Sequence, residues 1–221
     1  MSKGVKLLIN ALESTGKTTL TSNIENAMVV AIDSKPYPYS IPHYEFREFN
    51  GVVDFKNILV EKIKAYKEKY GKFPETVVID TVTKLYELIY IWAESEYKGF
   101  AIHNAISSST LQLNTMLDKL LVDRGINLVV TAHVQFDVNT NRFVVPATGQ
   151  FAKSGSWMSI VDNASYLFIQ GNERWIAHKD LQYPCRSTLD LKAKDLLNNY
   201  DVNEHISQLS KIADKTAGNA L

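Results

Sequence analysis

The chain has 221 residues, of which 45% are hydrophobic and 22% charged, a composition ordinary for a soluble α/β domain with a sizeable core. Lys+Arg and Asp+Glu both number 24, so the strongly basic footprint of a dedicated duplex-DNA binder is absent. The single cysteine, Cys185, excludes a disulfide framework or a cysteine metal site within one chain. No apolar stretch is long enough for a signal peptide or a membrane span, so we expect a cytoplasmic protein.

The first predicted strand, Val5–Ile9, leads into the segment Ala-Leu-Glu-Ser-Thr-Gly-Lys-Thr at residues 11–18. A strand, a glycine-containing loop ending in Gly-Lys-Thr and a following helix make up the phosphate-binding Walker A motif. Ala11 departs from the stricter pattern, which has glycine there, but relaxed versions of the motif accept alanine. The segment therefore predicts a site for a nucleoside triphosphate.

Each position of this loop has a chemical role in such a site. Gly16 allows close approach of the backbone to a phosphate, and the surrounding N–H groups form an anion nest. Lys17 supplies a positive charge for the β- and γ-phosphates, and the Thr18 hydroxyl is the expected Mg²⁺ ligand. The residues expected to bind nucleotide are Glu13, Ser14, Thr15, Gly16, Lys17, Thr18 and Thr19.

Three further apolar runs predict buried strands: Met28–Ile32, Thr76–Ile79 and Asn127–Thr131. A helix is expected at Asp54–Tyr70, and two more helical stretches separate the last two strands. Strands that alternate with helices predict crossover connections. The expected fold is therefore an α/β P-loop core with a mainly parallel central sheet flanked by helices.

The last third of the chain changes character, with short strand-like runs separated by glycine and asparagine. They predict antiparallel strands added to the sheet, with Asn172-Glu173 as a tight connection. The expected strands are Arg142–Val145, Ala164–Ile169, Arg174–His178 and Ser187–Leu191. We expect residues 1–200 to form the core, and residues 201–221 to form a C-terminal helix and tail.

Three polar residues follow predicted strands and are candidates for catalysis. Asp80 ends a buried strand, as a Walker B carboxylate that holds Mg²⁺ does. Asp33 follows another strand and is a candidate general base, with a helix cap or turn as the alternative. His133 is a candidate γ-phosphate sensor, a role that Gln135 could share, or else a histidine satisfied by a local hydrogen bond.

Lys192 and Lys194 alternate along a predicted extended segment, so both face the same way. Two cations on one face are suited to reach a phosphate on a neighbouring subunit. The alternative is a solvated edge strand, where lysine commonly prevents edge-to-edge pairing.

Together these segments resemble the RecA-like ATPases, and more narrowly the small phage-encoded RecA-core ATPases of single-strand annealing recombination, the Sak-type group of the AAA-domain family. The resemblance covers roughly residues 3–196 and rests on ALESTGKTT, VVAID, VVIDT, VVTAH and STLDLKAKD. It implies hydrolysis of ATP with Mg²⁺ held by Thr18 and Asp80, and catalytic roles for Lys17, Asp33, Asp80, His133, Lys192 and Lys194.

The resemblance also implies partners. Lysines that act in trans imply a homo-oligomer, a ring or filament with nucleotide between subunits. The family further implies single-stranded DNA, a single-strand-binding or annealing protein as partner, no membrane, and the host cytoplasm if the chain is phage-encoded. The DNA-binding region would be Phe136–Ser159, with the cations Arg142 and Lys153 and the aromatic residues Phe151 and Trp157, or else an ordinary hairpin with a packed tryptophan.

One departure bears on catalysis. RecA-like proteins commonly carry a glutamate two residues after the strand-end aspartate, and here that residue is Lys35. Either Asp33 acts as the base, or hydrolysis is slow, or a carboxylate such as Glu45 or Glu48 replaces it.

Two other functions remain open. One is a P-loop kinase of a nucleotide or small metabolite, which is disfavoured because such kinases carry an arginine-rich lid. The arginines available here are not clustered in the sequence: Arg47, Arg124, Arg142, Arg174 and Arg186. The other is a non-hydrolysing interaction protein gated by nucleotide, which the Lys35 departure favours.

Overall fold

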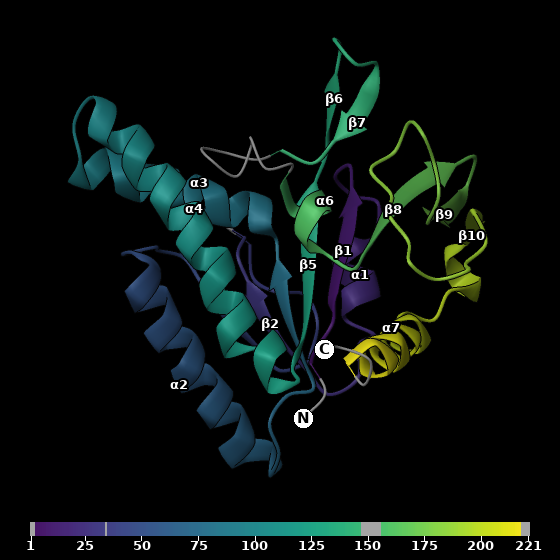
Figure 1. Cartoon of the computed structure of the whole chain (residues 1–221), viewed down its shortest axis with the longest axis horizontal. Coiled ribbons are helices and arrows are strands. Elements are labelled where there is room, and N and C mark those ends of the chain that lie inside the picture. Colours follow the sequence, from purple (N-terminus) through teal and green to yellow (C-terminus); the bar gives the residue numbers. More distant parts are fainter. Residues whose placement is uncertain (1–2, 34, 147–155, 218–221) are drawn as a thin grey trace.

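The computed structural model describes residues 3–33, 35–146 and 156–217 and shows a mainly parallel sheet between two layers of helices (Figure 1). The described sheet has eight strands in the order β10-β9-β8-β1-β5-β4-β2-β3, and a two-stranded hairpin, β6-β7, projects from one end. The strands are β1 Lys6–Ala11, β2 Ala27–Ala31, β3 His43–Glu45, β4 Thr76–Asp80, β5 Asn127–His133, β6 Gln135–Asp137, β7 Arg142–Val144, β8 Asn163–Gln170, β9 Glu173–Ala177 and β10 Lys194–Leu196. This arrangement confirms the predicted fold class.

Two layers of helices bury the two faces of the sheet. On one face α2, α3 and α4 pack over an aromatic and aliphatic core, and on the other face α1 and α7 cover a smaller cluster (Figure 1). In α2 the residues Phe55, Leu59 and Ile63 recur at helical spacing and are all buried. The helices are α1 Lys17–Thr21, α2 Val52–Tyr70, α3 Val82–Glu96, α4 Phe100–Leu120, η1 Val122–Arg124, α6 Ser156–Ile160, η2 Leu197–Asn199 and α7 Val202–Ala217.

The parallel register decides which residues meet at the carboxyl ends of the strands. In the β1–β5 pair Ala11 aligns with His133, and in the β2–β4 pair Ala31 aligns with Asp80. The loop after β1, the ends of β4 and β5, and the segment after β2 therefore share one edge of the sheet. Ligands of open α/β sheets bind outside this edge.

The antiparallel strands depart in detail from the sequence prediction. The prediction of a strand at Ser187–Leu191 is wrong. Next to this segment, residue 186 makes only an isolated bridge, and the edge strand β10 lies further on, at Lys194–Leu196. The tight connection is Gly171-Asn172, because Gln170 pairs with Glu173. Gly171 has a φ of +63°, a backbone conformation that glycine adopts without strain. The short elements β3, β6 and α6 were not predicted, because they are too short to show a hydrophobic period.

Candidate active site

The loop between β1 and α1 closes around the side chain of Lys17. Lys17 Nζ donates hydrogen bonds to the carbonyl oxygens of Leu12, at 2.8 Å, and Ala11, at 3.3 Å. Gly16, directly before α1, has a φ of +105°, which a residue with a Cβ rarely adopts. The sequence thus folds locally into a hollow with a cation at its base.

The Lys17 ammonium is unusually easy to deprotonate for a lysine. It is 5% exposed, and this burial lowers its pKa to about 8, although the nearby carboxylates of Asp80 and Glu13 oppose the shift. His133 Nδ1 lies 3.3 Å from Lys17 Nζ. Burial, with the lysine charge as a second cause, lowers the pKa of His133 as well, so the imidazole is neutral near pH 7.

Hydrogen bonds fix the carboxylate and the imidazole at the strand ends. Asp80, 6% exposed, accepts a hydrogen bond at 2.5 Å from the hydroxyl of Thr131 on β5. The backbone N–H of His133 donates to the hydroxyl of Thr83 at 3.0 Å, which ties the end of β5 to the start of α3. Both functional groups are therefore held by neighbouring elements and are pre-organised for a ligand.

These groups line one cavity of about 540 Å³. It brings together the loop, the segment after β2, the ends of β4 and β5, the start of α3 and β9. Its lining residues are Glu13, Ser14, Thr15, Gly16, Lys17, Thr18, Thr19, Ala31, Ile32, Asp33, Lys35, Pro36, Tyr37, Pro38, Tyr39, Asp80, Thr81, Lys84, His133 and Arg174.

Residues 3–196 match the protein family described as AAA domain. The match spans most of the chain and both nucleotide motifs. The chain belongs to this family. The family is one of P-loop nucleoside triphosphatases, and we call the cavity beside its Walker A loop the nucleotide cavity. No curated protein matches the chain.

The donors in this AAA domain suit Mg²⁺. The Thr18 hydroxyl and the Asp80 carboxylate both line the cavity, and oxygen ligands are those that Mg²⁺ prefers. In nucleotide sites Mg²⁺ takes one or two protein ligands and otherwise binds waters and phosphates. Accordingly, no cluster of three or more His, Cys, Asp or Glu side chains suited to a metal occurs among the described residues.

The predicted catalytic base and its two alternatives differ in whether they line the cavity. Asp33 is exposed and lines the cavity, whereas Glu45 and Glu48 are not among the described lining residues. Glu45 instead accepts a hydrogen bond at 2.8 Å from Arg47. Lys35, the residue at the glutamate position of RecA-like proteins, also lines the cavity of this AAA domain.

The two predicted trans-acting lysines lie away from this cavity in the same chain. Lys194, on the edge strand β10, pairs with Asp180 at 2.8 Å, and Lys192, before that strand, pairs with Asp195 at 3.3 Å. Gln135 lies on β6 and is likewise outside the described lining. In one chain, therefore, only His133 of the two sensor candidates faces the nucleotide site.

The predicted DNA-binding region divides into parts with different surroundings. Arg142 is exposed and Phe136 is 50% exposed, both on the projecting β6-β7 hairpin. Of the two alternatives for Trp157, base stacking on DNA and packing in the core, the structure shows the second, because the side chain is 1% exposed within the core. Phe151 and Lys153 lie outside the described residues.

Several residues at the site were not predicted from the sequence. Tyr37 and Tyr39 line the cavity, and the Tyr39 hydroxyl lies 2.6 Å from the hydroxyl of Thr19 in the loop. Lys84, on the first turn of α3, also lines the cavity, and it pairs with Glu87, which does not. Arg174 is the only arginine among the described lining residues, so the arginine-rich lid of a kinase has no counterpart there. A lysine just after the Walker B strand is the one signal that could have pointed to Lys84.

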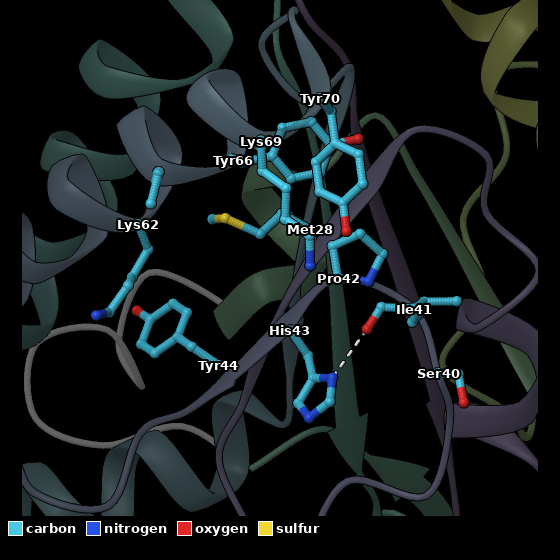
Figure 2. Close-up of a pocket in the computed structure, with 11 residues that line it drawn as sticks. Met28, Ser40, Ile41, Pro42, His43, Tyr44, Lys62, Tyr66, Lys69 and Tyr70 are labelled. Atoms are coloured by element: carbon cyan, nitrogen blue, oxygen red, sulfur yellow. Dashed lines mark hydrogen bonds between the residues drawn. The ribbon is translucent and has the colours of Figure 1, made fainter.

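A second hollow, of about 350 Å³, lies between α2 and the segment around β3, at the opposite edge of the sheet from β10 (Figure 2). The rings of Tyr44, Tyr66 and Tyr70 and the amine of Lys62 border it, and His43 Nδ1 lies 2.8 Å from the Ile41 carbonyl oxygen. It shares none of its described lining residues with the nucleotide cavity.

Within the described ranges, no helix of this AAA domain has the length and apolarity needed to cross a bilayer.

Proposed function

We propose that the protein is a Mg²⁺-dependent ATPase of the RecA-like type that acts on single-stranded DNA in phage-type recombination, annealing or replication. The observation that carries the proposal is the single cavity shared by Lys17, Asp33, Asp80 and His133. A buried cation and two carboxylates at one sheet edge supply phosphate binding, a metal ligand and a base for phosphoryl transfer to water, and the imidazole adds a polar contact.

Each side chain has a defined task in this proposal. Lys17 binds the β- and γ-phosphates, while Thr18 and Asp80 hold Mg²⁺, which neutralises charge on the phosphates when bound. Asp33, exposed at the cavity, orients and deprotonates the attacking water. His133 contacts the γ-phosphate and, through β5, connects the site to the adjoining β6-β7 hairpin.

The proposed assembly is a homo-oligomeric ring or filament with nucleotide at the subunit interfaces. Lys192 and Lys194 supply cations to the neighbouring nucleotide. The Lys192 side chain is 77% exposed and that of Lys194 44% exposed, so both are accessible to a second subunit. Their pairs with Asp195 and Asp180 would be exchanged for phosphate contacts on assembly.

The proposed contact with single-stranded DNA is the β6-β7 hairpin. The hairpin projects from the sheet at the end of β5 (Figure 1). It carries an exposed cation, Arg142, and an exposed aromatic ring, Phe136. Backbone attraction together with base stacking is the common mode for flexible single strands.

ATP turnover with and without single-stranded DNA tests this proposal. We expect multiple turnover that requires Mg²⁺ and rises with a single-stranded oligonucleotide but not with a duplex. Lys17→Ala should abolish it, and Asp33→Asn should slow turnover while nucleotide still binds. Lys119→Ala, an exposed lysine on α4 outside the cavity, is the matched control. Turnover that is insensitive to single strands would remove the DNA part of the proposal.

A second candidate is a non-hydrolysing interaction protein gated by nucleotide. It is favoured by Lys35, which lines the cavity where RecA-like proteins have a carboxylate. Tight nucleotide binding with less than one turnover per site would support this candidate over the ATPase.

A further inference from the structure

Arg174 is brought to the nucleotide cavity by the antiparallel extension of the sheet. Strand β8 lies beside β1, where Leu167 aligns with Ala11, the last residue before the phosphate loop. Ile169 lies two residues further along and pairs with Arg174 on β9. Arg174 therefore lies beyond the end of β1, level with the loop that follows it.

The alternation of β9 directs Arg174 to the face of the sheet that carries α1. Ile176, two residues along the strand, is buried in the cluster that includes Leu20 of α1. Trp175, on the opposite face, stacks with Phe168 instead. The strand period thus places Arg174 on the same face as the phosphate loop.

The arginine side chain lies directly across Gly16. A Cβ added to Gly16 would lie 3.6 Å from Arg174 Cδ and Nε and 3.8 Å from Cζ, which is van der Waals contact. Arg174 and Lys17 therefore approach one cavity from two sides, the lysine from the base of the loop and the arginine from above it.

The guanidinium also retains its hydrogen-bonding capacity. Arg174 is exposed, and within the described part of the chain its side chain makes no hydrogen bond or ion pair. Two of the lysines that line the cavity differ from it: Lys17 is bonded to loop carbonyls and Lys84 is paired with Glu87. A fork of five donors beside a loop built for phosphate matches a phosphate group in a bidentate manner.

We propose that Arg174 binds the phosphate chain of the nucleotide held by its own subunit. This inference rests on the proposed function and adds to it a cation supplied in cis, independent of the neighbouring subunit. The flexible stem lets the guanidinium follow the phosphates, and its charge stabilises the negative charge that develops on them during transfer.

Calorimetric titrations of the full chain with ATP, ADP and tripolyphosphate test the inference. Arg174→Ala should weaken ATP and tripolyphosphate binding by about 10- to 100-fold, the range for charge-assisted hydrogen bonds. Arg174→Lys should recover part of the affinity, because the charge remains while the bidentate geometry is lost. Arg124→Ala, an exposed arginine in η1 at the opposite end of β5, should bind as the unmodified chain does.

The outcomes separate this inference from the proposed function. Equal ATP affinity and turnover in Arg174→Ala and the unmodified chain would overturn the inference and leave the ATPase standing. If ATP binds in a manner that depends on Arg174 but is not turned over, the inference stands and the ATPase fails. If neither ligand binds the unmodified chain, both fail.

A mixing experiment tests whether the arginine acts in cis. In a mixture of Lys17→Ala and Arg174→Ala chains, every site lacks one of the two cations if both come from the same chain. Turnover should then stay at the level of the separate variants. Recovery of turnover would show that Arg174 acts on a neighbouring subunit and would overturn the assignment in cis.

Discussion

Two regions of the molecule bury polar side chains with opposite consequences. One is the nucleotide cavity, and the other is a polar cluster beneath α7 formed by Asn163, Ser165, His178, Tyr200 and His205. In the cavity, Lys17 is buried and His133 half-buried; both have lowered pKa values, and both line open space. In the cluster, His178 and His205 are 3% and 2% exposed, and burial lowers the pKa of each to about 4. Lowered pKa values alone therefore do not identify a functional site.

What distinguishes the two regions is where the polar atoms find partners. In the cluster, His205 Nε2 lies 2.8 Å from Asn163 Nδ2, and its Nδ1 lies 2.6 Å from the Tyr200 hydroxyl. His178 Nδ1 lies 2.8 Å from the hydroxyl of Ser165. These side chains satisfy one another and join α7 to the sheet, whereas Lys17 and His133 line an open cavity that a ligand can enter.

Removal of the Walker B carboxylate should give the largest functional effect. Asp80→Asn should lower Mg²⁺-dependent ATP turnover by about 1,000-fold, because the metal loses a charged ligand. Binding of ATP without Mg²⁺ should change little. Asp123→Asn, which removes only a surface pair with Lys3, serves as the control for turnover and for stability. Normal turnover in Asp80→Asn would show that the carboxylate holds no catalytic metal.

A substitution in the α7 cluster should instead affect stability. His205→Leu removes one of the partners of the Asn163 amide and the partner of the Tyr200 hydroxyl, and the free energy of unfolding should fall by about 3 kcal/mol. Urea denaturation measures this loss, and ATP affinity below the transition should be unchanged. His103→Leu, an exposed histidine on α4, is the matched control. A change in ATP affinity in His205→Leu would show that the two regions are coupled.

The same cluster predicts loss of stability in acid. Because His178 and His205 have lower pKa values folded than unfolded, the unfolded chain binds more protons between about pH 6.5 and pH 4. Their contribution is complete above pH 6.5 and is lost as the pH falls through this window. From pH 7 to pH 5 we expect a loss of about 2 kcal/mol per histidine.

Urea denaturation at several pH values measures this dependence. Asp195 opposes the shift of His178, while the Lys179 charge and the neighbouring histidine add to the shifts. His205→Leu should remove about half of the slope. A stability that is flat between pH 7 and pH 5 would contradict the neutral, buried state of both histidines.

The sequence predicts best what depends on position along one strand or loop. Asp33, Asp80 and His133 follow apolar runs, and parallel strands bring such ends to one edge, so their meeting with Lys17 at one cavity could be predicted. The Gly16-Lys17 pair is likewise a local signal. These features need only the order of the elements.

What the sequence does not predict depends on register between distant segments. Arg174 reaches Gly16 only because the Gly171-Asn172 turn and the β1–β8 register fix its position along β9, level with the loop. His205 meets Asn163 only when α7 packs on the sheet. Trp157 carries no periodic pattern of its own in a short helix, so composition alone did not show that it is buried.

The smallest expected effect is a pH dependence of ATP affinity that arises from the ionisation of Lys17. Its pKa of about 8 in the free protein should rise when phosphate binds beside it, so binding above pH 8 requires the uptake of a proton. ATP affinity should therefore be level up to about pH 8 and fall about tenfold per pH unit above it. Titrations from pH 7 to pH 9.5 measure the curve, and Lys17→Arg should remain level, because its guanidinium stays protonated. A level curve in the unmodified chain would mean that the buried ammonium keeps the pKa of an exposed lysine.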